Sequence, residues 1–176
     1  MKQLLILSIA ILSTTAFGQV SADHMRTAAE LFMNQDYAGS LIECDKAIAL
    51  NSETASYFKS RGSVHFMLEN DSAALWNLNK ALSLNEELAT AHHGLSLLYL
   101  RQENSELGIA ASLKAVEYDP KNAEYMNVVS DQYYNNDDIE QALNYNSKAI
   151  ALDPEDADFH FNRSLFLFDQ DRLRAL

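Results

Sequence analysis

A pattern of polar, small and apolar positions recurs along the chain every 34 residues. Four segments align without a gap, and in each of them a lysine is followed by an alanine and then by an apolar residue. The lysines are Lys46, Lys80, Lys114 and Lys148, and the alanines are Ala47, Ala81, Ala115 and Ala149. The 176 residues include only five Gly and two Pro, which leaves little material for the turns of an all-β domain. The pattern therefore predicts a repeated helical unit.

Two further columns of the repeat hold small residues. When the repeated alanine is numbered as position 27, position 20 is Ser40, Ala74, Gly108 and Ala142, and position 8 is Ala28, Gly62, Ser96, Ser130 and Ser164. This period with these columns resembles the tetratricopeptide repeat. The resemblance implies an all-α fold, a right-handed α-solenoid of antiparallel helix hairpins. Its repeats would lie near residues 21–54, 55–88, 89–122 and 123–156, with a partial repeat at 157–176.

Small side chains are needed where two antiparallel helices approach closely, so these columns mark the contacts within and between hairpins. We expect the first helix of each repeat, helix A, near 22–34, 55–68, 89–102, 123–136 and 157–170. The second helix, helix B, is expected near 37–50, 71–84, 105–118 and 139–152. Thr54, Asn122 and Asp156 can cap the helix that follows each of them, whereas Leu88 at the matching place cannot.

The first residues differ from the rest of the chain. Lys2 precedes an apolar run from Leu4 to Leu12, and Ala16 and Gly18 supply the small residues that a signal peptidase requires. We expect residues 1–18 to be a signal peptide that is cleaved before Gln19. The apolar stretch is shorter than the roughly 20 residues that span a bilayer, which disfavours membrane insertion of the mature chain. The mature domain, residues 19–176, is expected to be extracytoplasmic, either periplasmic or secreted.

The charge balance limits the possible partners. The chain has 13 basic and 25 acidic residues and a net charge of −12, and losing Lys2 makes it one unit more negative. Such a surface repels nucleic acid and anionic lipid, so neither is expected as a partner. Cys44 is the single cysteine, and its repeat position favours a packed small side chain over a reactive thiol.

Nothing in the sequence supports catalysis, a cofactor or a metal ion. His24, His92 and His160 share one repeat position but lie two repeats apart, too far for one metal site. The acidic residues cluster at turns and helix starts, where solvent and the helix dipole suit them. The chain lacks a glycine-rich phosphate loop and a nucleophile elbow. We therefore expect a protein that is not an enzyme.

The resemblance also implies where a partner would bind, because ligands of this family lie against helix A. The corresponding groove residues are Lys59, Ser63, Phe66, His93, Leu97, Arg101, Asn127, Asp131 and Tyr134. The sequence predicts a protein or peptide partner for a non-catalytic interaction scaffold. Two alternatives stay open: Phe66 and Tyr134 instead pack between hairpins, or the repeats serve a longer envelope enzyme or signalling protein that continues beyond residue 176.

The partial fifth repeat consists of a helix A alone and is unusually apolar. Its large side chains are Phe159, Phe161, Leu165, Phe166, Leu167 and Phe168. Four consecutive apolar residues spread around most of a helix, so part of this surface should be uncovered. We expect either that the sequence is a fragment of a longer repeat protein or that this end docks on a partner or a second copy.

Overall fold

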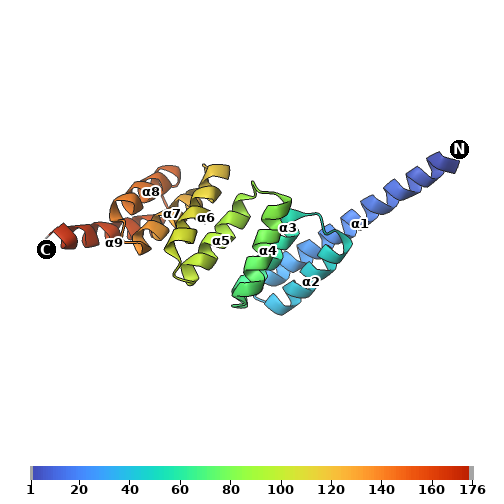
Figure 1. Ribbon diagram of the computed structural model, residues 1–176, viewed down its shortest axis with the longest axis horizontal. Coiled ribbons are helices and arrows are strands. Elements are labelled where there is room, and N and C mark those ends of the chain that lie inside the picture. The colour runs from blue at the N-terminus through green and yellow to red at the C-terminus, as the bar shows by residue number, and fades with distance from the viewer. Residues whose placement is uncertain (1, 175–176) are drawn as a thin grey trace. The chain divides into compact units, whose positions relative to one another are not determined.

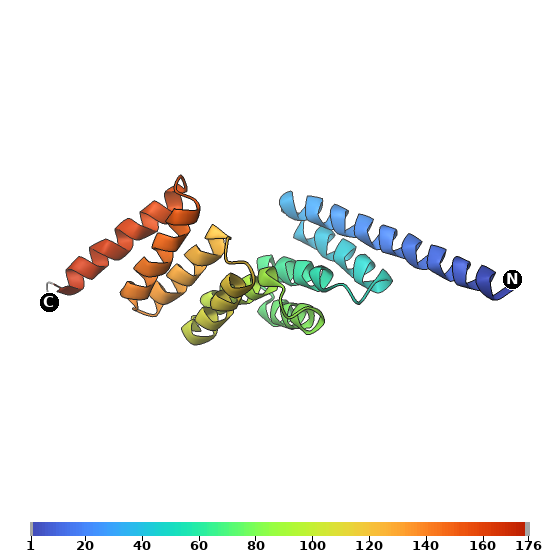
Figure 2. The ribbon, with the colours of Figure 1, turned by 90° about the horizontal axis from the view of Figure 1, so that it is seen from above.

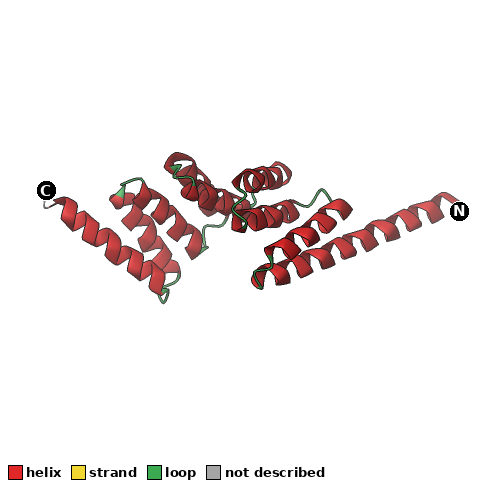
Figure 3. Cartoon of the chain, turned by 90° about the horizontal axis from the view of Figure 1, so that it is seen from below, coloured by secondary structure: helices red, strands yellow, loops and turns green. Residues whose placement is uncertain are grey.

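The computed structural model describes residues 2–174, and side chains are described for residues 18–173. The side chains of residues 1–17, which make up all but the last residue of the expected signal peptide, therefore lie outside the described part, as do residues 175 and 176 of the partial repeat. Within residues 2–174 the chain consists of helices joined by short loops, as Figure 3 shows. The helices are α1 (Lys2–Met33), α2 (Tyr37–Leu50), α3 (Ala55–Met67), α4 (Asp71–Leu84), α5 (Ala89–Arg101), α6 (Ser105–Tyr118), α7 (Ala123–Asn135), α8 (Ile139–Leu152) and α9 (Ala157–Arg174).

The predicted helix bounds agree with these ranges except at the two ends. All four helices B begin and end at the predicted residues. The first helix A is not a separate element that starts near residue 22, because α1 runs without a break from Lys2. No proline interrupts this stretch, so nothing ends the helix between the leader and the first repeat.

The described chain divides into two compact units at the loop between α4 and α5. The first unit spans Met1–Glu86 and the second spans Glu87–Leu176. In the first unit, α1 packs on α2 and α3 packs on α4, while α2 and α3 join the two hairpins (Figures 1 and 2). In the second unit, α5 packs on α6, α7 on α8, and α9 on α8. Each unit is thus a stack of helical hairpins.

The small residues of the repeat lie where the helices meet. Of the alanines at position 27, Ala47, Ala81 and Ala149 are fully buried, and Ala115 is 1% exposed. Residues at position 8 are equally buried in the four complete repeats. Since these side chains have no bulk, the helix backbones can approach closely and large neighbours fill the space around them. The predicted close contacts are confirmed.

The same turn joins helix A to helix B in all four hairpins. The amide of the last turn residue donates to a carbonyl five residues earlier, for example Asn70 to His65 at 2.9 Å. The same residue then caps helix B with its side chain, as the Asn70 amide oxygen does at Ala73. The capping residues are Asp36, Asn70, Asn104 and Asp138. The same polar residue therefore binds a free carbonyl at the end of helix A and caps the start of helix B.

The expected caps of helix A are only partly present. Asn122 accepts from the Tyr125 amide at 3.3 Å, and Asp156 accepts from the Phe159 amide at 3.2 Å. Thr54 makes no side-chain capping bond, so that prediction is wrong. The Tyr57 amide instead donates to the backbone carbonyl of Thr54 at 3.1 Å. Leu88 makes no side-chain cap, as its chemistry requires.

The start of the first repeat is held by one buried serine. Ser21 is fully buried, and its hydroxyl donates to the Gly18 carbonyl at 2.9 Å. The same hydroxyl lies 3.2 Å from that of Tyr57 on α3. The serine thus contacts both its own helix and the next repeat.

The last helix, α9, has one covered face and one uncovered face. Phe159 and Phe166 are 3% and 1% exposed, whereas Phe161 and Phe168 are 68% and 67% exposed. Ser164 is exposed although its counterparts in the four complete repeats are buried. The expected uncovered apolar surface is therefore present on this helix.

Each A–B turn contains a residue with left-handed backbone geometry. These residues are Gln35, Glu69, Glu103 and Asp137, with φ between 55° and 63°. Left-handed backbone geometry costs a residue other than glycine about 1–2 kcal/mol. A change to glycine recovers only part of this cost, because glycine loses more backbone entropy on folding. We expect Glu69→Gly and Glu103→Gly each to raise the free energy of unfolding by up to about 1 kcal/mol, measured by urea denaturation.

The neighbouring Gln102 gives a matched control for that prediction. Its φ is −87°, so Gln102→Gly gains nothing from left-handed geometry and should lower stability. If Glu103→Gly lowers stability as much as Gln102→Gly does, the turn geometry described here is wrong.

A second stability prediction concerns Gly108, whose counterparts in the other helices B carry a side chain. A Cβ atom at Gly108 would lie 2.7 Å from the amide carbon of Gln132, a fully buried side chain that donates to the Ser96 carbonyl at 2.8 Å. Gly108→Ala should therefore cost about 1–3 kcal/mol through overpacking. In a Gln132→Ala background the same change should be neutral or stabilising, because alanine favours the helix. A double-mutant cycle by denaturation measures this coupling, and additive effects would contradict the contact.

Candidate functional site

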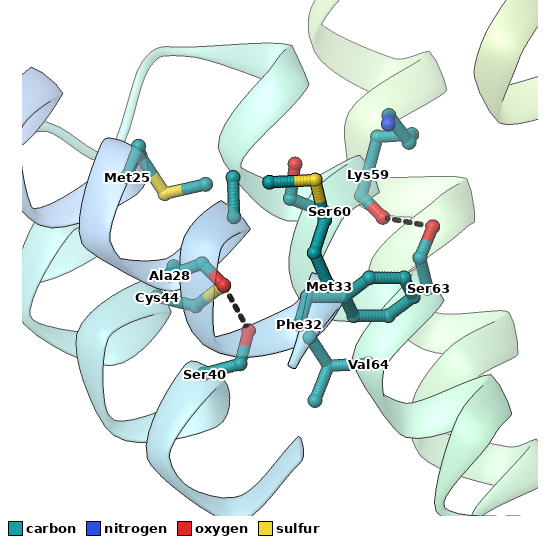
Figure 4. A pocket seen from close by; sticks show the side chains of 11 residues that line it. Met25, Ala28, Phe32, Met33, Ser40, Cys44, Lys59, Ser60, Ser63 and Val64 are labelled. Atoms are coloured by element: carbon teal, nitrogen blue, oxygen red, sulfur yellow. Dashed lines mark hydrogen bonds between the residues drawn. The ribbon is translucent and has the colours of Figure 1, made fainter. Parts of the chain in front are cut away.

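The first unit carries an open cavity of about 270 Å³ on its helix A surface. Eleven residues from α1, α2 and α3 line it, and Figure 4 shows their side chains from close by. They are Met25, Ala28, Ala29, Phe32, Met33, Ser40, Cys44, Lys59, Ser60, Ser63 and Val64. We call this cavity the unit 1 pocket.

The wall of the unit 1 pocket is mostly apolar. Ala28, Cys44 and Val64 form a buried cluster at 1–2% exposure, against which Met25 and Phe32 pack. The Ser40 hydroxyl donates to the Ala28 carbonyl at 2.8 Å, so it is satisfied inside the protein (Figure 4). The cavity therefore offers a ligand a mostly apolar surface, with the polar groups of Lys59, Ser60 and Ser63 on its α3 side.

Cys44 contributes packing to this wall. Its side chain is 1% exposed, and burial, followed by the charge of Asp45, raises the pKa of the thiol to about 11. A thiol with such a pKa is a poor nucleophile at neutral pH. The predicted structural role of Cys44 is confirmed.

Lys59 is the one cation among the residues that line the pocket. The side chain is half-buried, and this burial lowers the pKa of its ammonium group below the usual value. Within the described residues, its ammonium group has no hydrogen-bond acceptor and no carboxylate partner. The Ser63 hydroxyl donates to the backbone carbonyl of Lys59 at 3.2 Å and not to its side chain (Figure 4).

Two neighbouring cations of the first unit differ from Lys59 in having carboxylate partners. Arg61 lies 2.6 Å from an oxygen of Asp45, and its guanidinium also donates to Asn77 at 2.7 Å. Lys46 lies 2.7 Å from Glu43. Lys59 therefore differs from these two neighbours in having no carboxylate partner within residues 18–173.

The second unit carries a polar cluster on the corresponding surface of α7. Asn127 and Asp131 lie one turn apart, and the Asn162 side chain of α9 donates to both, at 3.2 and 3.1 Å. Asn127 also donates to Asp131 at 3.3 Å. Burial, followed by the charge of Glu124, raises the pKa of Asp131 to about 7. Neutral amides hold this carboxylate, and they cannot compensate its charge fully.

Tyr134, next to that cluster, is engaged inside the unit. Its hydroxyl donates to Asp169 of α9 at 2.5 Å, and its ring centroid lies 4.6 Å from that of Phe166. The hydrogen bond to Asp169 is the main reason why the pKa of Tyr134 is raised. This arrangement agrees with the alternative in which Tyr134 packs between adjacent hairpins.

The structure places some of the predicted groove residues at the unit 1 pocket and others away from it. Lys59 and Ser63 line the unit 1 pocket, whereas Phe66 is half-buried outside its lining. In the second unit, the His93 ring lies 5.0 Å from that of Tyr125, Leu97 is half-buried, and Arg101 is exposed. Whether any of these residues binds a partner stays a prediction.

Sequence reasoning identified only two of the eleven residues that line the pocket, Lys59 and Ser63. Met25, Ala29, Phe32 and Met33 come from the first repeat, at the same repeat positions that gave the groove residues of the later repeats. The signal was present, because counting 34 residues back from Lys59 and Ser63 reaches Met25 and Ala29. The contacts of Asn162 and Asp169 in the fifth repeat were also missed.

The histidines each have a different neighbour. His24 lies 2.6 Å from Glu43, His92 stacks on Tyr118, and His160 contacts the Pro154 carbonyl at 2.9 Å. The described residues contain no group of three or more metal-binding side chains. Among the helices that the structure describes, none combines the length and apolar character needed to cross a membrane.

Comparison with known proteins identifies the repeat. A tetratricopeptide repeat family model matches residues 89–122, the segment of α5 and α6. Residues 89–122 therefore form a tetratricopeptide repeat. No curated protein sequence matches the chain.

Solved tetratricopeptide structures share its fold. The pilF protein of Pseudomonas aeruginosa aligns with a TM-score of 0.83 at 12% identity, covering 89% of this chain and 72% of its own. A MamA fragment from Desulfovibrio magneticus RS-1 aligns at 0.76 and 15% identity, covering 86% of both chains. YrrB, described as a tetratricopeptide protein with an unusual peptide-binding site, aligns at 0.68 and 23% identity, covering 87% of this chain and 79% of its own.

These likenesses confirm the predicted fold class, an all-α solenoid of tetratricopeptide hairpins. Proteins of this fold are typically non-catalytic scaffolds that bind other proteins, using the surfaces that stacked repeats create. At identities of 12–23%, the likeness supports the fold and not the residues that bind a partner.

The raised pKa of Asp131 gives a pH prediction for the tetratricopeptide array. The folded protein binds the proton of the Asp131 carboxyl group more tightly than the unfolded chain does. The stability gained from this protonated carboxyl group is therefore fully present below about pH 4 and is lost as the pH rises towards about 7. Asp131→Asn should remove this loss and raise the free energy of unfolding at pH 8 by on the order of 2–4 kcal/mol, with little effect at pH 4.

Denaturant titrations at several pH values measure this effect. Asp171→Asn, which changes an exposed carboxyl group of α9, is the matched control and should leave the pH profile almost unaltered. An equal response of the two variants would show that Asp131 is not the group responsible.

Proposed function

We propose that this tetratricopeptide chain is an extracytoplasmic, non-catalytic scaffold that binds an extended segment of a partner protein against its helices A. The unit 1 pocket is the observation that supports the proposal most directly. It is open to solvent, mostly apolar, and lined from two successive helices A, α1 and α3. Exposed apolar concavities of this kind are where proteins and peptides dock.

The extracytoplasmic location is proposed from the leader. Lys2, the apolar run and the small residues at Ala16 and Gly18 fit a signal peptide. Expression of the complete chain in a bacterium, followed by fractionation and N-terminal sequencing, tests it. A mature protein that begins at Gln19 in the periplasm is expected, and an unprocessed cytoplasmic product would refute the location.

The binding function can be tested by selection and pocket filling. A random peptide library displayed without free C-termini is selected on the purified chain, residues 19–176, and the recovered peptides are synthesised. Ala29→Trp fills the pocket from an exposed position, so it should weaken these peptides at least about tenfold, which corresponds to about 1.4 kcal/mol.

The control for that prediction lies on the same helix. Thr27 is exposed but does not line the pocket, so Thr27→Trp should bind the peptides as the unmodified chain does. Circular dichroism checks that both variants keep their helices. Failure to recover any peptide, or equal affinity for the Ala29→Trp variant, would count against the proposal.

A second candidate function is supported by α9. Its uncovered face carries Phe161 and Phe168, which favours a further polypeptide packed upon it. On this proposal the repeats are an accessory or sensing domain of a longer envelope enzyme or signalling protein, or they associate through this face. Mass measurements over a range of concentrations, with Phe161→Ser and Phe168→Ser, distinguish self-association from a monomer.

A further inference from the structure

The volume of the unit 1 pocket limits what can occupy it. At about 270 Å³ it lies below the roughly 300–1,000 Å³ of sites that enclose whole small molecules. It exceeds the roughly 150 Å³ of an apolar cavity that accepts a benzene ring. The pocket therefore suits one large apolar side chain together with a small neighbouring group.

The walls are suited to a variable apolar side chain. Met25 and Met33 stand on α1 beside Phe32, and Met33 is 75% exposed (Figure 4). Methionine side chains are flexible and polarizable, so they adapt to ligands of different shape. Apolar contact alone would therefore give affinity with little selectivity among apolar residues.

Lys59 supplies the selective element. Its ammonium group is partly desolvated at the pocket, and within the described structure no acidic side chain is paired with it. A ligand carboxylate would restore the interaction energy that desolvation removes. The net charge of −12 opposes acidic partners in general, so this one cation selects for a negative charge at one place rather than for an acidic chain.

We infer that the unit 1 pocket recognises an internal peptide segment in which a large apolar residue and an aspartate or glutamate are two positions apart, with the carboxylate on Lys59. In an extended peptide, residues two apart point to the same side and are about 6.6 Å apart. The flexible stem of lysine can adjust to that spacing. This inference rests on the proposed peptide-binding function and specifies its ligand.

The same displayed library tests it when it is selected in parallel on variants of Lys59. On the unmodified chain, recovered peptides should be enriched about fivefold in Asp or Glu two positions from an apolar anchor. Lys59→Met should keep the apolar anchor but lose the acidic preference. Lys59→Glu should replace that preference with Lys or Arg.

Lys46→Met is the matched control, because Lys46 is exposed, paired with Glu43 and outside the pocket. It should recover the acidic motif unchanged. Lys59→Gln replaces Lys59→Met if circular dichroism shows that the methionine variant does not fold.

The outcomes separate this inference from the proposed function. The inference would be overturned if the recovered peptides share an apolar anchor but show no preference for Asp or Glu. It would also be overturned if that preference persists in the Lys59→Met variant. Either result would leave the scaffold function intact. Recovery of no peptide on any variant would overturn both.

Discussion

Close approach of helix backbones through small side chains is the constraint on which the rest of this structure depends. Ala47, Ala81 and Ala149 are fully buried, and a larger residue at any of them would force two helices apart. Where the helices meet, the chain therefore has little freedom. The contact of Gly108 with Gln132 shows the same rule, because a larger side chain in one repeat is accommodated by a smaller one in its neighbour.

The surfaces outside these contacts are free to differ, and the two units use them differently. In the first unit, the helix A surface forms a mostly apolar cavity at which the Lys59 ammonium group has no carboxylate partner among the side chains that the structure describes. In the second unit, the matching residues Asn127 and Asp131 bind the Asn162 side chain of α9. The same repeat positions thus serve recognition in one unit, as we propose, and hold a neighbouring helix in the other.

The parts of the fold that depend on local sequence could be predicted. All helix B bounds follow from a period of 34 and from columns of small residues, which are visible without coordinates. The start of α1 could not be predicted from the repeat, because the leader continues the helix without a break. Thr54 was expected to cap α3, but its ability to accept a bond does not determine its rotamer.

The candidate site could be predicted only in part, because its contacts depend on the stacking of repeats. The sequence indicated that Lys59 faces the groove, but the absence of a counter-charge became visible only when Arg61 and Lys46 were seen paired with their own carboxylates. Tyr134 looked like a groove residue until the fold placed Asp169, 35 residues away, against its hydroxyl. Long-range pairs of this kind leave no periodic signal.

The buried hydroxyl of Ser21 has a consequence for how the protein matures. Its present acceptor, the Gly18 carbonyl, lies on the far side of the proposed cleavage bond, whereas Tyr57 belongs to the next repeat. Proteolytic removal of the leader would take away the intrahelical acceptor and leave the tyrosine oxygen as the partner of this hydroxyl. Because the Ser21–Tyr57 contact already joins the two repeats, the trimmed chain would keep at this serine only the bond that links the first repeat to the second.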